Sequence, residues 1–454
     1  MSGPVVILGG GLAGLGAAHA LAAAGREVLV LEAGDVVGGL SRTETFGDFR
    51  FDLGGHRFFT HDAQIAALVQ RLLGDELIDV PRSSTILLRG RYVDYPLRPA
   101  NALAALGPAT TARVVGDWLV EQVRAAAGRR PDVSLEDWVV RRFGRTLFSI
   151  YFKEYSEKVW GLPCDRISVG WVARRIEGLS LGRALRDAFT REHRGSVASL
   201  VDRFAYPRLG IGRLAERFAE ELAPHGRVLC GARVTGVRHE GGRVRAVTAA
   251  TPDGERSFAA GAVIATIPLP ALARLLDPPP TAEALAAAAA LGFRDLVLAA
   301  VAADRPTITD QSWIYLPDRT VPFGRLHEPK NWSRAMAPPE RSLVVAEWFC
   351  SRGDAVWEAG DGELAERTVA GLERLGYLGR GEVTGVRVLR IPAAYPLFDV
   401  GYERRAAAVR EGLAGIGNLL IAGRSGCFAY QNMDHAIRSG LDAARALLRG
   451  ENGP

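Results

Sequence analysis

The chain has 454 residues, 48% of them hydrophobic, and its 56 basic and 51 acidic side chains leave a formal net charge of only +5. This length is more than one hydrophobic core usually organises, so the sequence predicts two interleaved domains. Nearly all basic residues are arginine, and no basic helix, zinc-finger spacing or RNA-binding aromatic pair accompanies them. These features exclude nucleic acid as the expected partner.

The cysteines and the apolar segments argue against two further classes of protein. The four cysteines have no metal-ligand spacing, so reduced thiols and no metal site are expected. No run of 18 or more apolar residues occurs, which argues against a membrane-spanning helix. The chain enters a predicted strand at once, without a basic region and a cleavable apolar segment, so we expect a cytoplasmic protein.

The first 25 residues have the pattern of a dinucleotide-binding turn. The apolar run Val5–Leu8 predicts a buried parallel strand, and the Ala- and Leu-rich run to about Ala24 predicts the following helix. Between them, Gly9, Gly11 and Gly14 form the pattern G-x-G-x-x-G. The first glycine permits a tight turn, the second lets the backbone approach a pyrophosphate, and the third lets the helix pack closely on the sheet. We therefore expect the N-terminus of this helix to face the phosphates of a dinucleotide.

A carboxylate follows at the end of a second predicted strand, residues 27–31. Glu32 can accept hydrogen bonds from both ribose hydroxyls, which disfavours a 2′-phosphate. Gly39 and Arg42 belong to the stretch "GDVVGGLSR", an extension seen in flavoproteins of the glutathione-reductase class. Arg42 is a candidate contact for the second phosphate, with a solvated loop arginine as the alternative. The whole stretch favours FAD over NAD.

The C-terminal segment predicts a second contact with the same cofactor. Residues 419–422 predict a strand, a glycine turn follows, and a helix begins near Asn432. In FAD proteins of this type the last helix directs its positive end at the flavin. The predicted cofactor contacts in this segment are Gly423, Arg424, Asn432, Met433 and Asp434.

Because both ends of the chain are predicted to meet at one cofactor, the middle is expected to be inserted into the FAD-binding domain. The prediction is an α/β fold with a Rossmann-type, glutathione-reductase-like FAD-binding domain formed by residues 1–60, 206–275 and 405–454. Helical periods dominate residues 61–205, which predicts a mainly helical substrate-binding domain. Alternating strand patterns in residues 285–400 predict an antiparallel sheet beside the cofactor that also serves substrate binding.

A glycine pair and five later motifs occur in order along the chain. Gly54 and Gly55 precede His56, and two residues without side chains let the backbone approach a flat ring closely. The motifs "YSEKVWG", "WVARR", "GRLHEPK", "AAYPLF" and "GRSGCFAYQNMD" follow. With these motifs in this order, the chain resembles the flavin-dependent UDP-galactopyranose mutase family, inside the amine oxidase and protoporphyrinogen oxidase superfamily.

The resemblance assigns roles to individual side chains. It implies that the loop ending at His56 lies against the isoalloxazine of FAD and that Trp171 precedes a diphosphate-contacting Arg175 by four residues. Arginines suit a diphosphate because they donate bidentate, charge-assisted hydrogen bonds, and aromatic side chains can stack on a base. The implied catalytic residues are His56, Arg175, Arg325, Tyr395 and Tyr430, and the implied substrate-binding residues are Tyr151, Tyr155 and Trp160.

The activity implied by the resemblance is that of a nucleotide-sugar pyranose/furanose mutase. N5 of reduced FAD would attack the anomeric carbon as the diphosphate leaves, with NAD(P)H as the external reductant that primes the flavin. The alternative is a FAD-dependent oxidase or dehydrogenase of the amine oxidase or protoporphyrinogen oxidase type, whose site would need apolar walls and a hydride path. The base and sugar of the substrate stay open, and so does the oligomeric state, with a homodimer as one option.

Overall fold

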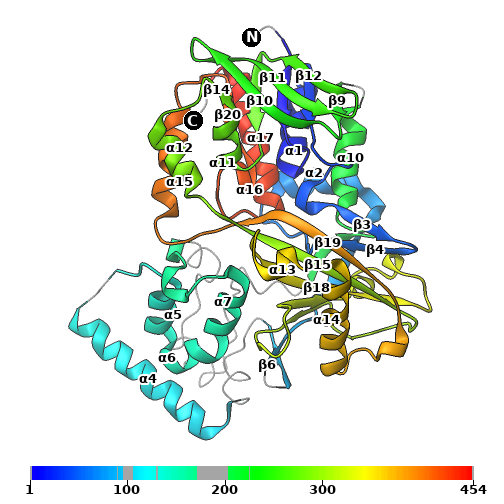
Figure 1. Ribbon diagram of the computed structural model, residues 1–454, viewed down its shortest axis with the longest axis vertical. Helices are drawn as coiled ribbons and strands as arrows, with labels where there is room; N and C mark the ends of the chain where they lie inside the picture. The colour runs from blue at the N-terminus through cyan, green and yellow to red at the C-terminus, as the bar shows by residue number, and fades with distance from the viewer. Residues whose placement is uncertain are drawn as a thin grey trace.

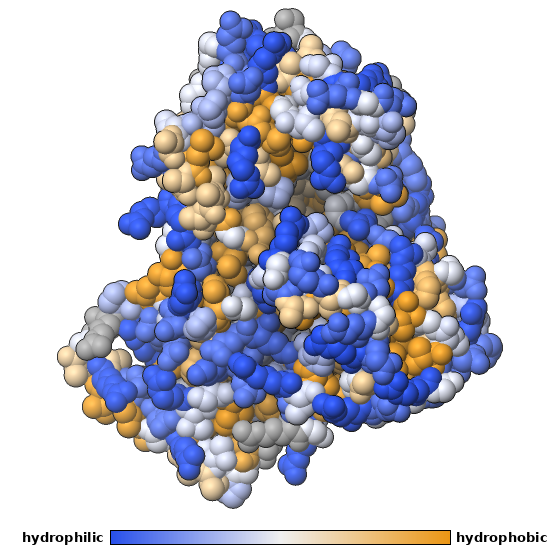
Figure 2. All heavy atoms as spheres, in the orientation of Figure 1, coloured by the Kyte–Doolittle hydropathy of each residue, from blue (hydrophilic) through white to orange (hydrophobic). Residues whose placement is uncertain are grey.

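The computed structural model describes residues 3–88, 90–95, 106–128, 131–170, 203–223 and 225–451. Both chain ends lie at one end of the molecule, long strands cross its middle, and a group of helices lies at the opposite end (Figure 1). Hydrophobic residues reach the visible surface where the first of these parts meets the second (Figure 2). Trp171 and Arg175 lie outside the described residues, so their implied roles stay predictions.

A parallel five-stranded sheet lies at the end of the molecule that holds both termini. Its strands pair in the order β20–β13–β1–β2–β9, and all neighbours are parallel. The three central strands are completely buried, as expected where helices cover both faces of a parallel sheet. This arrangement confirms the predicted α/β class with a Rossmann-type sheet. The bounds are β1 Val5–Leu8, β2 Val28–Leu31, β9 Gly226–Leu229, β13 Ala262–Ala265 and β20 Leu419–Ile421.

The first and last helices of the chain pack against each other beside this sheet. They are α1 (Leu12–Ala23) and α17 (Met433–Arg449). Glycine allows the close crossing, because a Cβ at Gly440 would lie only 2.0 Å from the carbonyl oxygen of Ala13. The helix α10 (Gly212–Leu222) packs on α1 as well. The two ends of the chain therefore share one packed layer.

A smaller sheet and several helices complete this part of the molecule. The sheet has the strand order β12–β11–β10–β14, and its β10–β11 and β11–β12 pairings are antiparallel. The helices α11, α12 and α15 pack on one another. The bounds are β10 Arg233–Glu240, β11 Arg243–Thr251, β12 Gly254–Ala259, β14 Leu276–Asp277, α11 Leu269–Leu275, α12 Ala282–Ala289, α15 Tyr402–Leu413 and α16 Gly423–Gly426.

A seven-stranded sheet crosses the middle of the molecule in the order β19–β15–β18–β17–β16–β6–β7 (Figure 1). All neighbouring pairs are antiparallel except β16 with β6. Strands β6 and β7 come from the segment predicted to be mainly helical. The helix α14 packs on β15 and β19. The bounds are β6 Ser84–Leu88, β7 Arg91–Asp94, β15 Phe293–Ala303, β16 Trp313–Tyr315, β17 Arg325–His327, β18 Ser342–Cys350, β19 Val383–Pro396 and α14 Asp361–Arg374.

A group of helices is attached to this sheet on the side away from the termini. Ser134 and Asp137 form a capping box that starts α5 (Leu135–Phe143), which explains where this helix begins. The chain then continues through α6 (Arg145–Leu147), the π-helical turn η3 (Phe148–Lys153) and α7. The remaining bounds are α2 Ala63–Leu73, α4 Pro108–Ala127, α7 Glu154–Trp160, α13 Ala355–Glu358, β3 Thr43–Phe46, β4 Phe49–Asp52, β5 Leu77–Pro81 and β8 Arg203–Pro207.

Buried side chains of β1, β15 and α5 belong to one continuous hydrophobic core, so the three parts of the molecule are packed together. Among the helices that the structure describes, none combines the length and the apolar character needed to cross a lipid bilayer.

Candidate functional site

The glycine turn after β1 has the geometry that its sequence pattern predicts. Gly9 has a φ of +104°, which favours glycine, and Gly11 is the N-cap residue of α1. A Cβ at Gly14 would lie 2.0 Å from the carbonyl oxygen of Gly9, so only glycine lets the helix pack this closely. Gly39 has a φ of +54° and lies over the same turn, because a Cβ there would be 3.4 Å from the Cα of Gly11. Backbone groups therefore form this end of the site.

Glu32 follows β2 and is held by backbone amides. Its Oε2 accepts a hydrogen bond from the Gly10 amide at 2.7 Å, and its Oε1 accepts one from the Gly34 amide at 2.8 Å. The carboxylate is thus fixed beside the glycine turn, where a ribose would follow the phosphates. Arg42 instead pairs with Glu44, at 2.6 Å between Nε and Oε1. Its predicted contact with the second phosphate stays a prediction.

The C-terminal turn meets the start of α1. A Cβ at Gly423 would lie 2.8 Å from the Cβ of Ala13, so this turn touches the first turn of α1. Asn432 is the N-cap of α17, with His435 as its partner in a capping box. Gln431 Oε1 and Asp434 Oδ1 are buried acceptors without a hydrogen-bond partner among the described residues. Unpaired buried acceptors at a helix start fit a polar ligand with donors, such as the edge of a flavin ring.

Arg424 lies between this turn and the aromatic side chains of the predicted substrate site. Its guanidinium donates to the carbonyl oxygen of Gln431 through Nε, at 2.7 Å, and through Nη2. Its Cζ is 5.8 Å from the ring centre of Tyr395 and 6.0 Å from that of Tyr430. Tyr395 therefore has one guanidinium near its ring, from Arg424, and another near its hydroxyl, from Arg325.

The loop of Gly54, Gly55 and His56 faces a tryptophan that the sequence did not single out. Gly54 has a φ of +123°, and a Cβ at Gly55 would lie 1.2 Å from Cζ3 of Trp313, so the indole ring lies directly on the Gly55 backbone. His56 is near the Gly54 carbonyl oxygen, at 3.2 Å from Nδ1. Burial, followed by the nearby Arg424, lowers the pKa of His56 to about 4. The imidazole is therefore neutral at physiological pH.

Arg325 is the centre of a buried polar cluster. It stands directly opposite Glu347 in the antiparallel pairing of β17 and β18, and its Nη1 lies 3.2 Å from Glu347 Oε2. Its Nε donates to Tyr155 Oη at 2.7 Å, and Nη1 is 3.4 Å from Tyr395 Oη. No described residue accepts a hydrogen bond from Nη2, and 10% of the side chain is exposed. One edge of the guanidinium is thus available to a ligand.

Aromatic rings enclose this guanidinium. Its Cζ lies 4.7 Å from the ring centre of Phe349, 5.4 Å from Trp313 and 5.9 Å from Tyr315. Burial alone would lower the pKa of Arg325, but the phenol groups of Tyr155 and Tyr395 and the carboxylate of Glu347 raise it above its ordinary value. The cation is therefore kept in a largely dry environment, where it interacts strongly with an anionic ligand.

Glu347 and His327 are members of the cluster that sequence reasoning missed. Burial alone would raise the pKa of Glu347, but Arg325, followed by His327, lowers it, so this fully buried group is a carboxylate. His327 lies between Trp313 and Trp332, with ring centres at 5.8 and 5.3 Å. A usable signal was present, because "SLVVAEWFC" places one acid inside an apolar strand, and a buried charge needs a partner.

The helix α7 contributes two further predicted residues to the cluster. Tyr155 bonds Arg325, and Trp160 packs 6.4 Å from Tyr395 between ring centres. Tyr430 lies 6.4 Å from Phe398, which itself is 5.9 Å from Trp160. Tyr151 is buried in the π-helical turn before α7. The structure thus brings the aromatic residues of three separate motifs together, while the predicted roles in substrate binding stay predictions.

Lys158 ties α7 to the turn that precedes Arg325. Its Nζ donates to the carbonyl oxygens of Leu316, Asp318 and Val321 at 2.8 to 3.0 Å. Burial lowers the pKa of Lys158 to about 8. Three carbonyl groups around one ammonium suit the tetrahedral donors of lysine rather than the planar fork of arginine. Lys158 therefore holds the turn before β17, and Tyr155 binds Arg325 on β17, from two points on one helix.

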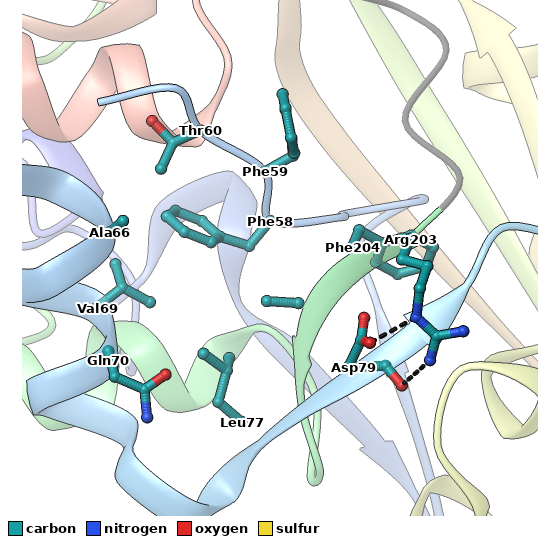
Figure 3. Close-up of a pocket in the computed structure, with 11 residues that line it drawn as sticks. Phe58, Phe59, Thr60, Ala66, Val69, Gln70, Leu77, Asp79, Arg203 and Phe204 are labelled. Carbon is teal, nitrogen blue, oxygen red and sulfur yellow. Dashed lines mark hydrogen bonds and ion pairs between the residues drawn. The ribbon is translucent and has the colours of Figure 1, made fainter. Parts of the chain in front are cut away.

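A separate cavity of about 310 Å³ lies between α2 and the strand pair β5–β8 (Figure 3). Apolar side chains such as Phe58, Leu77 and Phe204 line it, and the ion pair of Asp79 and Arg203 lies at its side. It contains none of the residues predicted to act at the site, so it is distinct from the Arg325 cluster.

Known proteins share this fold and parts of this sequence. A crystal structure of reduced UDP-galactopyranose mutase superposes with a TM-score of 0.85 at 23% identity, covering 99% of this chain and 96% of that one. A structure from Exiguobacterium sp. 255-15, assigned as a protoporphyrinogen oxidase, has a TM-score of 0.75 at 20% identity, covering 98% and 99% of the two chains. Phytoene dehydrogenase of Streptomyces griseus is 27% identical over 377 residues, 75% of this chain and 68% of that protein. At these identities the two structures show a common fold.

The sequence pattern of the flavin containing amine oxidoreductases matches residues 12–448, nearly the whole chain, from the first helix of the glycine turn to the last helix. The predicted membership of the amine oxidase superfamily and the likeness to UDP-galactopyranose mutase are both confirmed. The chain belongs to the flavin containing amine oxidoreductase family.

Proposed function

We propose that this protein is a flavin-dependent nucleotide-sugar mutase that exchanges pyranose and furanose rings. The observation that carries the proposal is the enclosed Arg325, which is oriented by Tyr155, Tyr395 and Glu347 and keeps one edge of its guanidinium available. The shared fold with UDP-galactopyranose mutase supports the same assignment.

The charge of the cluster favours an anionic substrate. Arg325 is neutralised in part by Glu347, Arg424 adds a second cation, and His56 is neutral. The net charge of these four groups is therefore positive, which attracts a diphosphate and repels the ammonium group of an amine substrate. This argument favours a nucleotide-sugar over an amine for this member of the family.

The residues of the glycine turn fit FAD. The N-terminus of α1 with Gly9, Gly11 and Gly14 would hold the pyrophosphate, and Glu32 would accept from the ribose. The start of α17, with the unpaired acceptors of Gln431 and Asp434, would face the flavin. When bound in its reduced form, FAD would supply a nucleophilic N5 for the anomeric carbon, with NAD(P)H as its reductant.

The side chains of the Arg325 cluster would orient and stabilise the leaving diphosphate. Arg325 would donate from its available edge, while the hydroxyls of Tyr395 and Tyr430 and the guanidinium of Arg424 would add donors at the same place. Tyr155 and Trp160 would form the aromatic surface for the base. Trp313 and Phe349 would exclude water, which strengthens each of these electrostatic interactions.

The test is anaerobic turnover of dithionite-reduced protein with a panel of UDP-, GDP- and dTDP-sugars, with products separated by chromatography. We expect ring isomerisation without net oxidation for at least one of these sugars. Arg325→Ala and Arg325→Lys should keep FAD absorbance and lose about 10²- to 10³-fold in kcat/KM, because the fixed donor is lost or displaced. Arg245→Ala, which changes an exposed arginine on β11 of the smaller sheet, is the matched control.

An oxidase or dehydrogenase is the second candidate, because a phytoene dehydrogenase matches 75% of the chain. Oxygen uptake with peroxide formation would support that candidate, and so would oxidation of an added substrate coupled to reduction of an artificial electron acceptor. Absence of isomerisation across the whole sugar panel, or unchanged isomerisation in both Arg325 variants, would reject the mutase proposal.

A further inference from the structure

The pairing of strands β15 and β19 is interrupted beside Tyr395. Leu296 stands opposite Ile391, and the next pair along the ladder joins Arg294 to Tyr395. One residue of β15 therefore faces residues 392–394 of β19, which form a β-bulge. In a regular ladder Tyr395 would lie two residues, or about 7 Å, further along the sheet. The bulge thus decides where Tyr395 stands.

The bulge brings Tyr395 into the Arg325 cluster. At its observed position the Tyr395 hydroxyl lies 3.4 Å from Arg325 Nη1, and its ring centre lies 6.3 Å from that of Phe349 and 6.4 Å from that of Trp160. A slip of one residue would move Tyr395 by about 3.3 Å and break its contact with Arg325. The cluster therefore depends on whatever keeps the bulge in place.

Asp295 is the residue of β15 that faces the bulge, and its side chain binds the bulge directly. Its Oδ1 accepts a hydrogen bond from the Ala393 amide at 2.7 Å, and its Oδ2 accepts one from the Arg352 amide at 2.6 Å. Only 5% of Asp295 is exposed, so water competes little for these two hydrogen bonds. Asp295 therefore fastens the bulge of β19 to the turn after β18.

The backbone of the bulge is strained. Ala393 has a φ of +52°, a region that favours glycine because a Cβ comes too close to the following carbonyl oxygen. Among the residues that the structure describes, one other non-glycine residue has a positive φ, Phe428 at +48°. Each of the two precedes a tyrosine of the proposed site, Tyr395 or Tyr430, by two residues. Strain of this kind persists only where the surroundings enforce it, and it collects at functional sites.

We propose that Asp295 is a positioning residue that keeps Ala393 in its left-handed conformation and thereby places the Tyr395 hydroxyl beside Arg325. The hydrogen bond from the Ala393 amide offsets the preference of alanine to leave this conformation. Asp295 acts through Tyr395 rather than on the substrate. Its effect on turnover therefore rests on the proposed function, whereas its effect on the position of Tyr395 does not.

The first test is the crystal structure of the FAD-loaded Asp295→Ala variant beside that of the wild type in the same crystal form. We expect Ala393 to leave the left-handed region and the Tyr395 hydroxyl to move by at least about 1 Å, out of hydrogen-bond reach of Arg325. Ala393→Val should give the same displacement with Asp295 in place, because a branched side chain disfavours a positive φ. This second variant decides the matter if Asp295→Ala does not fold. Tyr395 at its wild-type position in these variants would overturn the proposal.

The second test repeats the anaerobic assay with the same panel of UDP-, GDP- and dTDP-sugars. Asp295→Ala should lower kcat/KM about 10- to 100-fold, because the Tyr395 hydroxyl is misplaced. Asp295→Ala combined with Ala393→Gly should recover most of this loss, since glycine adopts a positive φ without help. In a Tyr395→Phe background Asp295→Ala should cost less than about twofold, because the hydroxyl that it positions is already absent. Glu382→Ala, which removes the acceptor of the Gly379 amide just before β19, is the control and should leave turnover unchanged.

The outcomes separate a positioning role from a general effect on stability. A loss of turnover that glycine at position 393 does not rescue, or that persists in full in the Tyr395→Phe background, would overturn the proposal. A wild type without turnover on any sugar of the panel would reject the proposed function alone. The position of Tyr395 in the variant structures would then still decide the role of Asp295.

Discussion

The glycine turn around β1 and the Arg325 cluster stabilise charged side chains in different ways. In the turn, backbone groups provide the stabilisation: two backbone amides donate hydrogen bonds to Glu32, and the close packing depends on glycines. In the cluster, side chains from α7, β17, β18 and β19 hold a buried ion pair inside aromatic rings. A site built from backbone should tolerate the loss of one side chain, whereas a site built from paired charges should not.

The largest effect is expected at Glu347. Glu347→Ala leaves the buried Arg325 without its carboxylate partner, and we expect the free energy of unfolding to fall by about 3 to 5 kcal/mol. Urea unfolding followed by tryptophan fluorescence, at fixed FAD concentration, measures the change. Glu366→Ala removes the exposed pair with Arg380 and should cost less than about 1 kcal/mol. Equal losses in the two variants would contradict the distinction drawn between buried and exposed pairs.

The two regions also differ in how far the sequence predicted them. Gly9, Gly11, Gly14 and Glu32 lie within 24 residues, so one local pattern contains the whole turn, and the Rossmann-type sheet followed from it. The Arg325 cluster is assembled by strand register: Glu347 is 22 residues from Arg325 in sequence and directly opposite it in the sheet. A register cannot be read from spacing alone, and for this reason the sequence analysis named Arg325 as a candidate but missed its partner Glu347.

His56 makes the charge balance of the cluster dependent on pH. Its pKa is lowered to about 4 in the folded protein, so between pH 4 and 6.5 the unfolded chain binds more protons and stability falls as the pH falls. We expect His56→Gln to remove about 2.4 kcal/mol of this acid sensitivity between pH 7 and pH 4.5, since one pKa unit corresponds to about 1.4 kcal/mol. The measurement is the difference in unfolding free energy between wild type and variant at pH 7 and pH 4.5.

Asp52 would oppose this trend in both proteins and so cancels in the difference. Burial raises the pKa of Asp52 to about 6, so its contribution favours the folded state at low pH and is lost as the pH rises. A wild type and a His56→Gln variant with parallel pH profiles would show that His56 is not held neutral by its surroundings.

A smaller effect is expected at Lys158, which supports the cluster through the backbone. Lys158→Met keeps the length of the side chain but leaves three carbonyl oxygens without their donor. We expect the free energy of unfolding to fall by about 2 kcal/mol. The loss is not larger because the variant no longer bears the cost of burying an ammonium group, which offsets part of the lost hydrogen bonds. Lys158→Arg should rescue little of it. Thermal unfolding measures these losses, and Lys153→Met, at an exposed lysine five residues earlier, should be neutral in it.

The smallest effect is expected at Glu32, in the region built from backbone. Glu32→Ala removes the acceptor of two amides and the proposed acceptor for the ribose, while the glycine turn and the start of α1, the proposed pyrophosphate site, stay unchanged. We therefore expect the Kd for FAD to rise about tenfold, or about 1.4 kcal/mol, with little loss of folding stability. Glu27→Ala, at an exposed acid just before β2, is the control in the same fluorescence titration of apoprotein with FAD. A loss of folding as severe as that of Glu347→Ala would mean that Glu32 organises the turn. In that case side-chain charge, rather than backbone geometry, would hold both regions.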